Sequence, residues 1–249
     1  MTKRKLLPGV SQTYVLERLR KAGGNEIGSG KFLSEDSSAA LAVNCFGWFA
    51  NRAQLLPSFP KLKAAFPATD VDIEFQARFP WAGGRHPWLD AVAITKSHLI
   101  GVESKRFEPF RDTKTVRFSK AFARDKWGRE MMHYQQLRVD LMSRAQRFRF
   151  LDATQLVKHA FGLRTQAARI GKLPVLVYLY AEPRFLKRHP IPASSLIEHR
   201  DEIARFSGIV KGDEVKFHSV SYLDWISTWS VRDRAVGRHG EALVAAFSP

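Results

Sequence analysis

Asp90, Glu103 and Lys105 are residue types that can bind cations and stabilise developing negative charge. They lie in two apolar runs within residues 88–105 that are separated only by Lys96–Ser97, which predicts a β-hairpin with a two-residue turn. Paired residue numbers in such a hairpin have a constant sum, so Asp90 lies opposite Glu103. Because side chains alternate between the faces of a strand, Lys105 shares the face of Glu103.

The remaining side chains of the hairpin predict which face is buried. The face away from the acidic pair is apolar and is expected to enter the core, through Leu89, Ala91, Ala93, Ile100 and Val102. The face that carries Asp90 also bears apolar residues, namely Val92, Ile94 and Leu99. Full exposure of the acidic face is therefore not expected.

Opposed carboxylates on neighbouring strands repel each other, more strongly as water is excluded, so they favour a compensating cation. Mg²⁺ takes one or two protein carboxylates and completes its octahedron with water and phosphate oxygens. Lys105 can orient an attacking water or stabilise the departing charge. Hydrolysis of a nucleic-acid phosphodiester is the reaction that suits this group. The alternative is a cross-strand cluster of ion pairs on an exposed face of the sheet.

The charge of the chain favours a polyanionic partner. Its 249 residues include 40 Lys and Arg against 24 Asp and Glu, a net charge of +16. Residues 105–149 alone hold 13 Lys and Arg against 5 Asp and Glu, which is +8. We expect a basic helical insertion at about 106–150 whose nucleic-acid-binding residues are Lys114, Arg117, Lys120, Arg124, Lys126 and Arg129.

Aromatic residues interrupt these basic residues at Phe118, Phe122 and Trp127. Basic side chains that contact the backbone, with aromatic rings that stack on bases, have this pattern. Solvated helix faces with aromatic residues turned into a core have it too. The sequence leaves both interpretations open.

The elements around the hairpin follow from hydrophobic periodicity and capping residues. A helix is expected over about 36–53, with Ser34 and Asp36 as candidate caps, followed by a strand over 71–76 and the hairpin. A helix capped by Asp152 then ends at Gly171, and a buried strand follows. Beyond it, the patterns indicate a helix over 194–206, a strand over 215–220, and helices around Trp225 and Leu243.

These elements and motifs resemble the PD-(D/E)XK nuclease superfamily, also called restriction-endonuclease-like. The resemblance rests on Asp90 followed by Glu103-Ser104-Lys105, and the run 101–110 resembles a bacterial restriction-endonuclease-like subgroup. It implies an α/β fold whose α-β-β-β-α-β core, a mixed sheet flanked by helices, spans about 36–181. The chain departs from the motif at Leu89, because Pro87 lies three positions before Asp90 rather than directly before it.

The resemblance also implies roles for individual residues. Asp90 and Glu103 would be metal ligands, the backbone carbonyl of Ser104 a further ligand, and Lys105 the catalytic lysine. A glutamine on the second helix sometimes lies beside the metal in this superfamily, which points to Gln155. The implied activity is hydrolysis of DNA by a restriction-type or repair-type endonuclease that uses Mg²⁺, with Mn²⁺ as a substitute.

The spacing Glu/Asp-x-Lys is not specific by itself, because it recurs at Asp112-Thr113-Lys114 and at Glu214-Val215-Lys216. Of the three triplets, only Glu103-Ser104-Lys105 has a carboxylate, that of Asp90, on the strand that faces it.

Four further residues are candidates for accessory roles. Glu74 could supply a third carboxylate, although a solvated strand face explains it equally well. Glu35, near a helix start, has a favourable dipole position as its simpler explanation. His86 lies shortly before the Asp90 strand, where packing of the loop competes with contact to substrate. His159 follows Gln155 by one helical turn.

Other features of the sequence exclude several protein classes. Cys45 is the one cysteine, so neither an internal disulfide nor a cysteine-based zinc site is expected, and its apolar surroundings indicate a buried thiol. The loop at 23–31 lacks the spacing of a phosphate-binding P-loop. No signal peptide or membrane span is expected, which favours a cytoplasmic protein without a membrane partner.

We therefore expect a single domain over 1–249, with residues 182–249 as a C-terminal extension. Cutting both strands of a duplex would favour a homodimer. A non-catalytic, basic nucleic-acid-binding protein is the alternative function, and an RNA-associated factor is a third.

Overall fold

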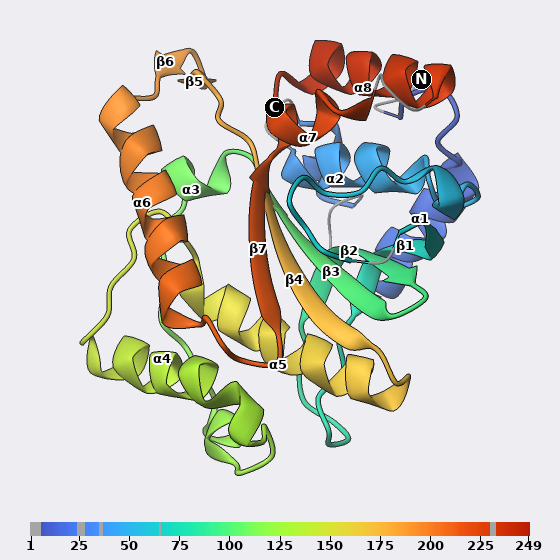
Figure 1. The fold of residues 1–249 in the computed structure, drawn as a ribbon. Coiled ribbons are helices and arrows are strands. Elements are labelled where there is room, and N and C mark those ends of the chain that lie inside the picture. Colours follow the sequence, from blue (N-terminus) through green and yellow to red (C-terminus); the bar gives the residue numbers. More distant parts are fainter. Residues whose placement is uncertain (1–5, 24–27, 35–36, 65, 230–232) are drawn as a thin grey trace.

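The computed structural model describes residues 6–23, 28–34, 37–64, 66–229 and 233–249. A five-stranded mixed sheet divides them into two layers of helices (Figure 1). The strands lie in the order β1-β2-β3-β4-β7, with the bounds Ala68–Gln76, Trp88–Thr95, His98–Lys105, Leu173–Tyr180 and Lys216–Ser221. The pairs β1–β2 and β2–β3 are antiparallel, and the pairs β3–β4 and β4–β7 are parallel.

The hairpin β2–β3 has the register that its two-residue turn predicts. Ala91 pairs with Val102 and Ile94 with Leu99, so the paired numbers sum to 193 along the whole ladder. The Thr95 hydroxyl accepts the peptide N–H groups of Ser97 and His98, at 3.4 and 3.0 Å, and stabilises the turn. The register that brings Asp90 toward Glu103 is confirmed.

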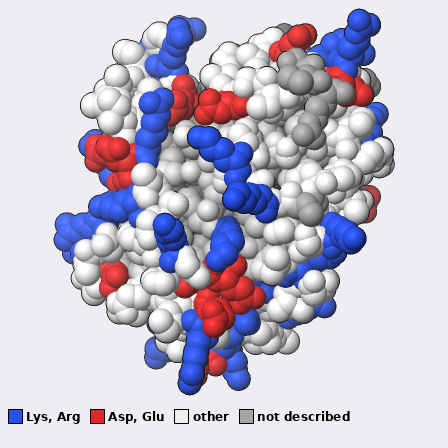
Figure 2. All heavy atoms as spheres, viewed as in Figure 1, with Lys and Arg blue, Asp and Glu red and all other residues white. Residues whose placement is uncertain are grey.

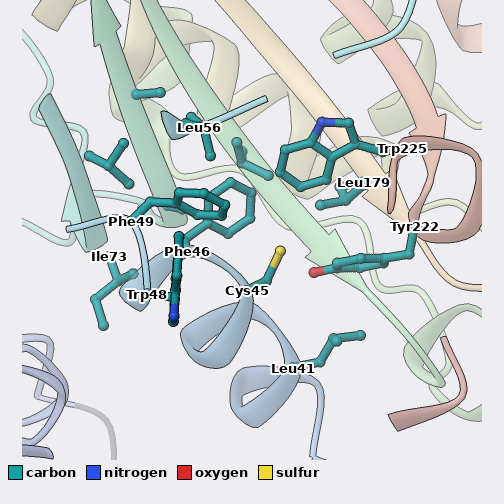
Figure 3. Close-up of a cluster of buried hydrophobic side chains, with 14 of the residues drawn as sticks. Leu41, Cys45, Phe46, Trp48, Phe49, Leu56, Ile73, Leu179, Tyr222 and Trp225 are labelled. Carbon is teal, nitrogen blue, oxygen red and sulfur yellow. The ribbon is translucent and has the colours of Figure 1, made fainter. Parts of the chain in front are cut away.

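One layer of helices covers the sheet face that holds the larger of the two buried hydrophobic clusters. It consists of α1 (Gln12–Lys21), α2 (Ser38–Gly47), α7 (Tyr222–Ile226) and α8 (Arg234–Phe247). The side chains of α2 pack between the sheet and α7, and Phe46 stacks on Trp225 with ring centroids 5.5 Å apart (Figure 3). Cys45 lies in the same cluster and is fully buried. Burial raises the pKa of its thiol, which therefore stays protonated and acts as a packing group.

The opposite layer consists of α3 (Glu108–Arg111), α4 (Met132–Ser143), α5 (Ala153–Arg169) and α6 (Ala193–Ile209). Its longest contact with the sheet is made by α5, whose apolar stripe includes Leu156, Ala160 and Leu163. Leu163 lies so close to Gly101 of β3 that a Cβ there would come within 3.1 Å of it. The helix therefore packs directly over the strand that carries Glu103.

Several expectations about element boundaries are wrong. The helix expected over 36–53 begins at Ser38, capped by Ser37, whose hydroxyl accepts Ala40 N–H at 3.1 Å, and ends at Gly47. The predicted cap Asp36 lies outside the described residues. Trp48 and Phe49 continue the apolar pattern from a turn, so periodicity alone overextends the helix.

Leu89 lies on the face opposite to the expected one. It packs with Val92 and Leu99 in the core beneath α5, whereas Ala91 enters the other core. The alternation breaks opposite Glu74, which has φ +50°, although the register of the β1–β2 pair is the same on both sides of it. Asp90, between Leu89 and Ala91, lies at the break.

The segment after β3 is only partly helical. It contains α3, an extended stretch over 112–119, two 3₁₀ turns and α4. The C-terminal segment includes β7, which is the fifth strand of the main sheet, and a two-stranded ribbon of β5 (Phe185–Leu186) and β6 (His189–Pro190). Among the described residues, no helix combines the length and apolar character that crossing a bilayer requires.

Candidate active site

The carboxylate of Asp90 lies where the β2–β3 ladder ends. Backbone pairing stops at Ala91 and Val102, and beyond that pair Asp90 Oδ2 accepts the peptide N–H of Ser104 at 2.7 Å. A side chain of β2 thus takes the place that a β2 carbonyl would occupy in a continuing ladder. The β2–β3 ladder therefore ends one residue before Glu103.

Glu103 is buried, with 1% of its surface exposed, and a basic group approaches each carboxylate oxygen. Lys105 Nζ forms an ion pair with Oε1, and His159 Nδ1 from α5 lies 2.9 Å from Oε2. Lys105 lies on the face of Glu103 because both are in β3 two residues apart. The structure therefore brings together Asp90, Glu103 and Lys105 as the hairpin predicts, and adds His159.

The two carboxylates have opposite electrostatic environments. Burial raises the pKa of Asp90 well above its usual range, and the charge of Glu103 raises it further. Burial also acts to raise the pKa of Glu103, but Lys105 and His159 outweigh it and hold that pKa at about 2. Burial acts to lower the pKa of Lys105, yet Glu103 and Asp90 raise it above its ordinary value. Lys105 is thus an ammonium group that donates hydrogen bonds.

The backbone of Ser104 faces the gap between β2 and β3. Ala181 N–H donates to the Lys105 carbonyl at 2.8 Å, so that carbonyl points toward β4. Because peptide groups alternate in direction along a strand, the N–H and C=O of Ser104 both point toward Asp90. The Ser104 side chain points to the face of the sheet opposite to Glu103, where its hydroxyl lies 2.6 Å from the Tyr222 hydroxyl at the start of α7. This contact braces the end of β3 against the opposite layer.

A cavity of about 90 Å³ lies beside Lys105, and Gln155 is part of its lining. Lys105 and Gln155 both line it, together with Tyr178 of β4 and Lys114. Tyr178 is held by a 3.0 Å contact between its hydroxyl and His199 Nε2, and burial lowers the pKa of His199 to about 4. Lys114 donates to the carbonyls of Glu108 and Asp112, which fixes the segment that closes the cavity.

The basic residues named from the sequence do not form one cluster. Lys114 and Arg117 line a large groove of about 960 Å³ that shares Lys114 and Asp152 with the smaller cavity. Lys120, Lys126 and Arg129 are exposed and lie outside its lining, and so is Arg124, whose guanidinium lies 4.9 Å from the Trp81 ring. Lys and Arg side chains are spread over the face shown in Figure 2, where Asp and Glu gather in small groups.

Two of the three aromatic residues in the basic segment belong to the core. Trp127 is 1% exposed and stacks on Phe161 of α5 with centroids 4.2 Å apart, and Phe122 packs against it. Neither ring is available to stack on bases, so the core interpretation holds for both. Phe118 is partly exposed and lines the groove.

The accessory candidates have different positions. Glu74 lies opposite Asp90, between the pairs Ile73–Ala91 and Phe75–Leu89, and its charge contributes to raising the pKa of Asp90. His86 accepts the Phe79 N–H through Nδ1 at 3.1 Å and packs within its own loop. Glu35 lies outside the described residues.

A divalent cation, which the resemblance implies, can be tested against these donors. Within the described residues, the buried oxygens of Glu103 accept no peptide N–H, and their polar neighbours are Lys105 Nζ and His159 Nδ1. No group of three His, Cys, Asp or Glu side chains in the described part of the chain is placed to hold a metal. Mg²⁺ needs only one or two carboxylates, so the pair Asp90 and Glu103, with the Ser104 carbonyl, fits its requirements.

Sequence reasoning did not find several residues that surround the site. Tyr178 and Tyr222 have the pattern of core aromatics in their elements, and no local pattern indicates that their hydroxyl groups reach β3 or the cavity. Arg144 and Arg147 lie in the second wall of the groove, which forms only when the end of α4 folds next to 114–119. Their place in a basic stretch was the one available signal.

The α/β architecture, with its mixed sheet between two helical layers, is compatible with a restriction-endonuclease-like fold. The chain belongs to the family of restriction endonucleases associating with ARP (REase-ARP), whose family model matches residues 5–239. Membership in this family suggests a nuclease-type function. No curated protein and no solved structure matches the chain.

Proposed function

We propose that this protein is a metal-dependent nuclease of the PD-(D/E)XK type that hydrolyses DNA phosphodiester bonds. One observation carries the proposal: the Asp90 carboxylate at the open end of the β2–β3 ladder, next to the buried Glu103 and its partner Lys105. Family membership supports the same interpretation. A restriction-type or repair-type role, and the association with ARP that the family description names, extend to this chain as parts of the proposal.

The roles of the residues follow from their environments. Asp90, Glu103 and the Ser104 carbonyl would hold Mg²⁺ or Mn²⁺. When bound, the cation would lower the pKa of a water and neutralise charge on the phosphate. Lys105 keeps its proton and would therefore orient the attacking water or stabilise negative charge on phosphate oxygens, rather than accept a proton.

The neighbouring helix supports this arrangement. His159 lies against Glu103 Oε2 and limits the orientations of that carboxylate, which makes it a positioning residue. Gln155 shares the cavity with Lys105 and would donate to a water or a phosphate oxygen there. Both act from the buried face of α5, which the core holds rigidly.

A plasmid-cleavage assay with Mg²⁺, with Mn²⁺ and with EDTA tests the proposal. We expect nicking or linearisation only with the cations, and its loss in Lys105→Gln. Lys216→Gln is the matched control, because Lys216 ends another Glu-x-Lys triplet and is exposed at the far end of β7. Cleavage that survives in Lys105→Gln, or that EDTA does not stop, would contradict the proposed centre.

A non-catalytic nucleic-acid-binding protein is the second candidate. It is favoured by the pairing of Glu103 with Lys105 and His159, which already neutralises one carboxylate without a metal. This function predicts salt-sensitive binding of nucleic acid that is indifferent to divalent cations and to Lys105→Gln. Binding of RNA in preference to DNA would instead point to an RNA-associated factor.

A further inference from the structure

The groove of about 960 Å³ lies between two segments that are distant in the sequence. One wall is the extended stretch 114–119, the other runs from the end of α4 to Phe148, and residues 151–154 at the start of α5 form the floor. Basic side chains lie on both walls: Lys114 and Arg117 on the first, Arg144 and Arg147 on the second. Among the described residues, the one acidic side chain in the lining is that of Asp152, whose Oδ1 caps α5 by accepting the Gln155 N–H at 2.8 Å.

The arginines of the groove differ from those beside it. Within the described residues, Arg117, Arg144 and Arg147 form no ion pair with an acidic side chain. Just outside the lining, Arg149 lies 3.6 Å from Glu198 and Arg205 lies 3.8 Å from Glu202. The arginines beside the groove thus have acidic partners within the chain, whereas the positive charge of the groove arginines is available to an anionic ligand.

Arg144 occupies its place in a strained backbone conformation. It ends α4 in the left-handed region, with φ +64°, where glycine or asparagine is the usual residue. This conformation ends the helix at the groove, where the exposed side chain of Arg144 belongs to the lining.

We propose that the groove binds one strand of DNA and leads it toward the cavity beside Lys105. The choice of DNA rests on the proposed function. The groove and the cavity share Lys114 and Asp152, so a strand that lies in the groove comes next to the cavity that Lys105 lines. The phosphates lie against Arg117, Arg144 and Arg147, which form both sides of the path.

The dimensions and the aromatic residues favour a single strand over a duplex. A volume of about 960 Å³ is at the upper end of the range for small-ligand pockets, which suits a few nucleotides of one strand. Phe118 and Phe148 line opposite walls, with Lys158 and Arg205 over their respective rings. Basic grooves lined with aromatic rings are typical of single-strand binding sites.

Fluorescence anisotropy in EDTA, where the proposed cleavage cannot occur, tests this inference with labelled single-stranded DNA, duplex DNA and single-stranded RNA. The test variant is Arg144→Gly, which removes the side chain and relieves the left-handed backbone. Arg188→Gly is the matched control, because Arg188 is exposed, has φ +69° and lies in the β5–β6 turn outside the groove. Unfolding by urea, measured for both variants, shows that each remains folded.

We expect Arg144→Gly to weaken binding of single-stranded DNA about tenfold, as the removal of one charged hydrogen bond implies. The slope of log affinity against log salt becomes shallower by about 0.7 for each phosphate that the variant no longer neutralises. Arg188→Gly leaves both quantities at their wild-type values. Equal affinities for the two variants would show that the groove is not the binding site. Tighter binding of duplex DNA would contradict the proposal that the groove takes a single strand, and tighter binding of RNA would contradict the choice of DNA.

The proposed function and this inference fail separately. Groove-dependent binding without metal-dependent cleavage would defeat the proposed function alone. If cleavage depends on metal but Arg144→Gly binds single-stranded DNA as tightly as wild type, only the proposed role of the groove would be contradicted.

Discussion

Two pairs of acidic residues on the α5 side of the sheet have opposite environments. Glu202 accepts three peptide N–H groups, from Arg149, Phe150 and Leu151, at 2.6 to 2.8 Å. Asp213 likewise accepts the N–H groups of His133 and Tyr134. These carboxylates hold the two ends of the segment that contains α4.

Asp90 and Glu103 have a different arrangement. Asp90 accepts one peptide N–H, and the oxygens of Glu103 accept none from the described residues, with a lysine and a histidine beside them instead. Buried carboxylates that serve the fold are satisfied by hydrogen bonds. Asp90, which is partly buried, and the buried Glu103 instead lie close together as two carboxylates on neighbouring strands. Such an arrangement is destabilising by comparison and is typical of residues kept for binding or catalysis.

The largest expected effect separates activity from stability at Asp90. We expect Asp90→Asn to reduce metal-dependent DNA cleavage about a thousandfold, because it removes a proposed metal ligand. The free energy of unfolding should not fall, since the substitution removes a carboxyl group whose ionised form the fold disfavours, as its raised pKa shows. Plasmid cleavage and urea unfolding measure the two quantities.

Asp70→Asn is the matched control for this prediction. Asp70 is exposed on β1 and opposite Ile94, so the same change of charge is made on the neighbouring strand. A loss of stability in Asp90→Asn, without any loss of cleavage, would place Asp90 with Glu202 and Asp213 as a structural carboxylate.

Glu202 should show the reverse behaviour. Glu202→Ala leaves three peptide N–H groups without their acceptor, so the free energy of unfolding should fall by roughly 3 kcal/mol or more. Urea denaturation checks this value. On the same helix, Glu198 is exposed and pairs loosely with Arg149, so Glu198→Ala should change stability by less than about 0.5 kcal/mol. Similar decreases in the two variants would contradict the role assigned to Glu202.

Divalent cations should stabilise the protein through the pair Asp90 and Glu103. At a hundredfold excess of Mg²⁺ over its dissociation constant, the free energy of unfolding should rise by about 2.7 kcal/mol. Thermal unfolding at increasing Mg²⁺ measures the effect, and NaCl of equal ionic strength is the control. The increase should be smaller in Asp90→Asn; an increase of the same size would show that the cation binds elsewhere.

The smallest effect is the pH dependence of stability without metal. The pKa of Asp90 is raised in the fold, so its contribution to stability is present below the unfolded pKa and is lost as pH rises through the folded one. Glu103 has the opposite sign: with a folded pKa of about 2, it contributes above its unfolded pKa and loses that contribution as the pH falls toward 2.

Urea unfolding over a range of pH, in wild type and Asp90→Asn, tests these signs. The stability of the variant relative to wild type should increase as the pH rises from the unfolded pKa of aspartate through the raised pKa of Asp90. A constant difference across that range would mean that Asp90 has an ordinary pKa in the fold.

Local patterns were sufficient for much of the sheet and for the centre of the site. A two-residue turn at Lys96–Ser97 allows only one register that keeps both apolar faces inside, so the approach of Asp90 to Glu103 could be predicted. The strand at 174–180 and the helix capped by Asp152 were found for similar reasons, because burial periodicity and capping act over a few residues. The helix over 36–53 was too long because Trp48 and Phe49 are buried from a turn.

The remaining features depend on contacts between distant segments. Leu89 changes face next to the point where Glu74, on another strand, has a left-handed backbone, and His159 meets Glu103 only when α5 packs on β3. The second wall of the groove requires α4 to fold beside 114–119. None of these contacts has a local signal, since each joins residues that are far apart in the chain.

The sequence by itself determined the hairpin, its register and the group of Asp90, Glu103 and Lys105, because turn length and strand alternation are local constraints. Only the tertiary structure decided the environment of that group: which carboxylate is neutralised, which basic residues share a groove, and which aromatic rings are buried. These properties depend on distance and on the exclusion of water, and both are set by packing between layers that the chain brings together from opposite ends.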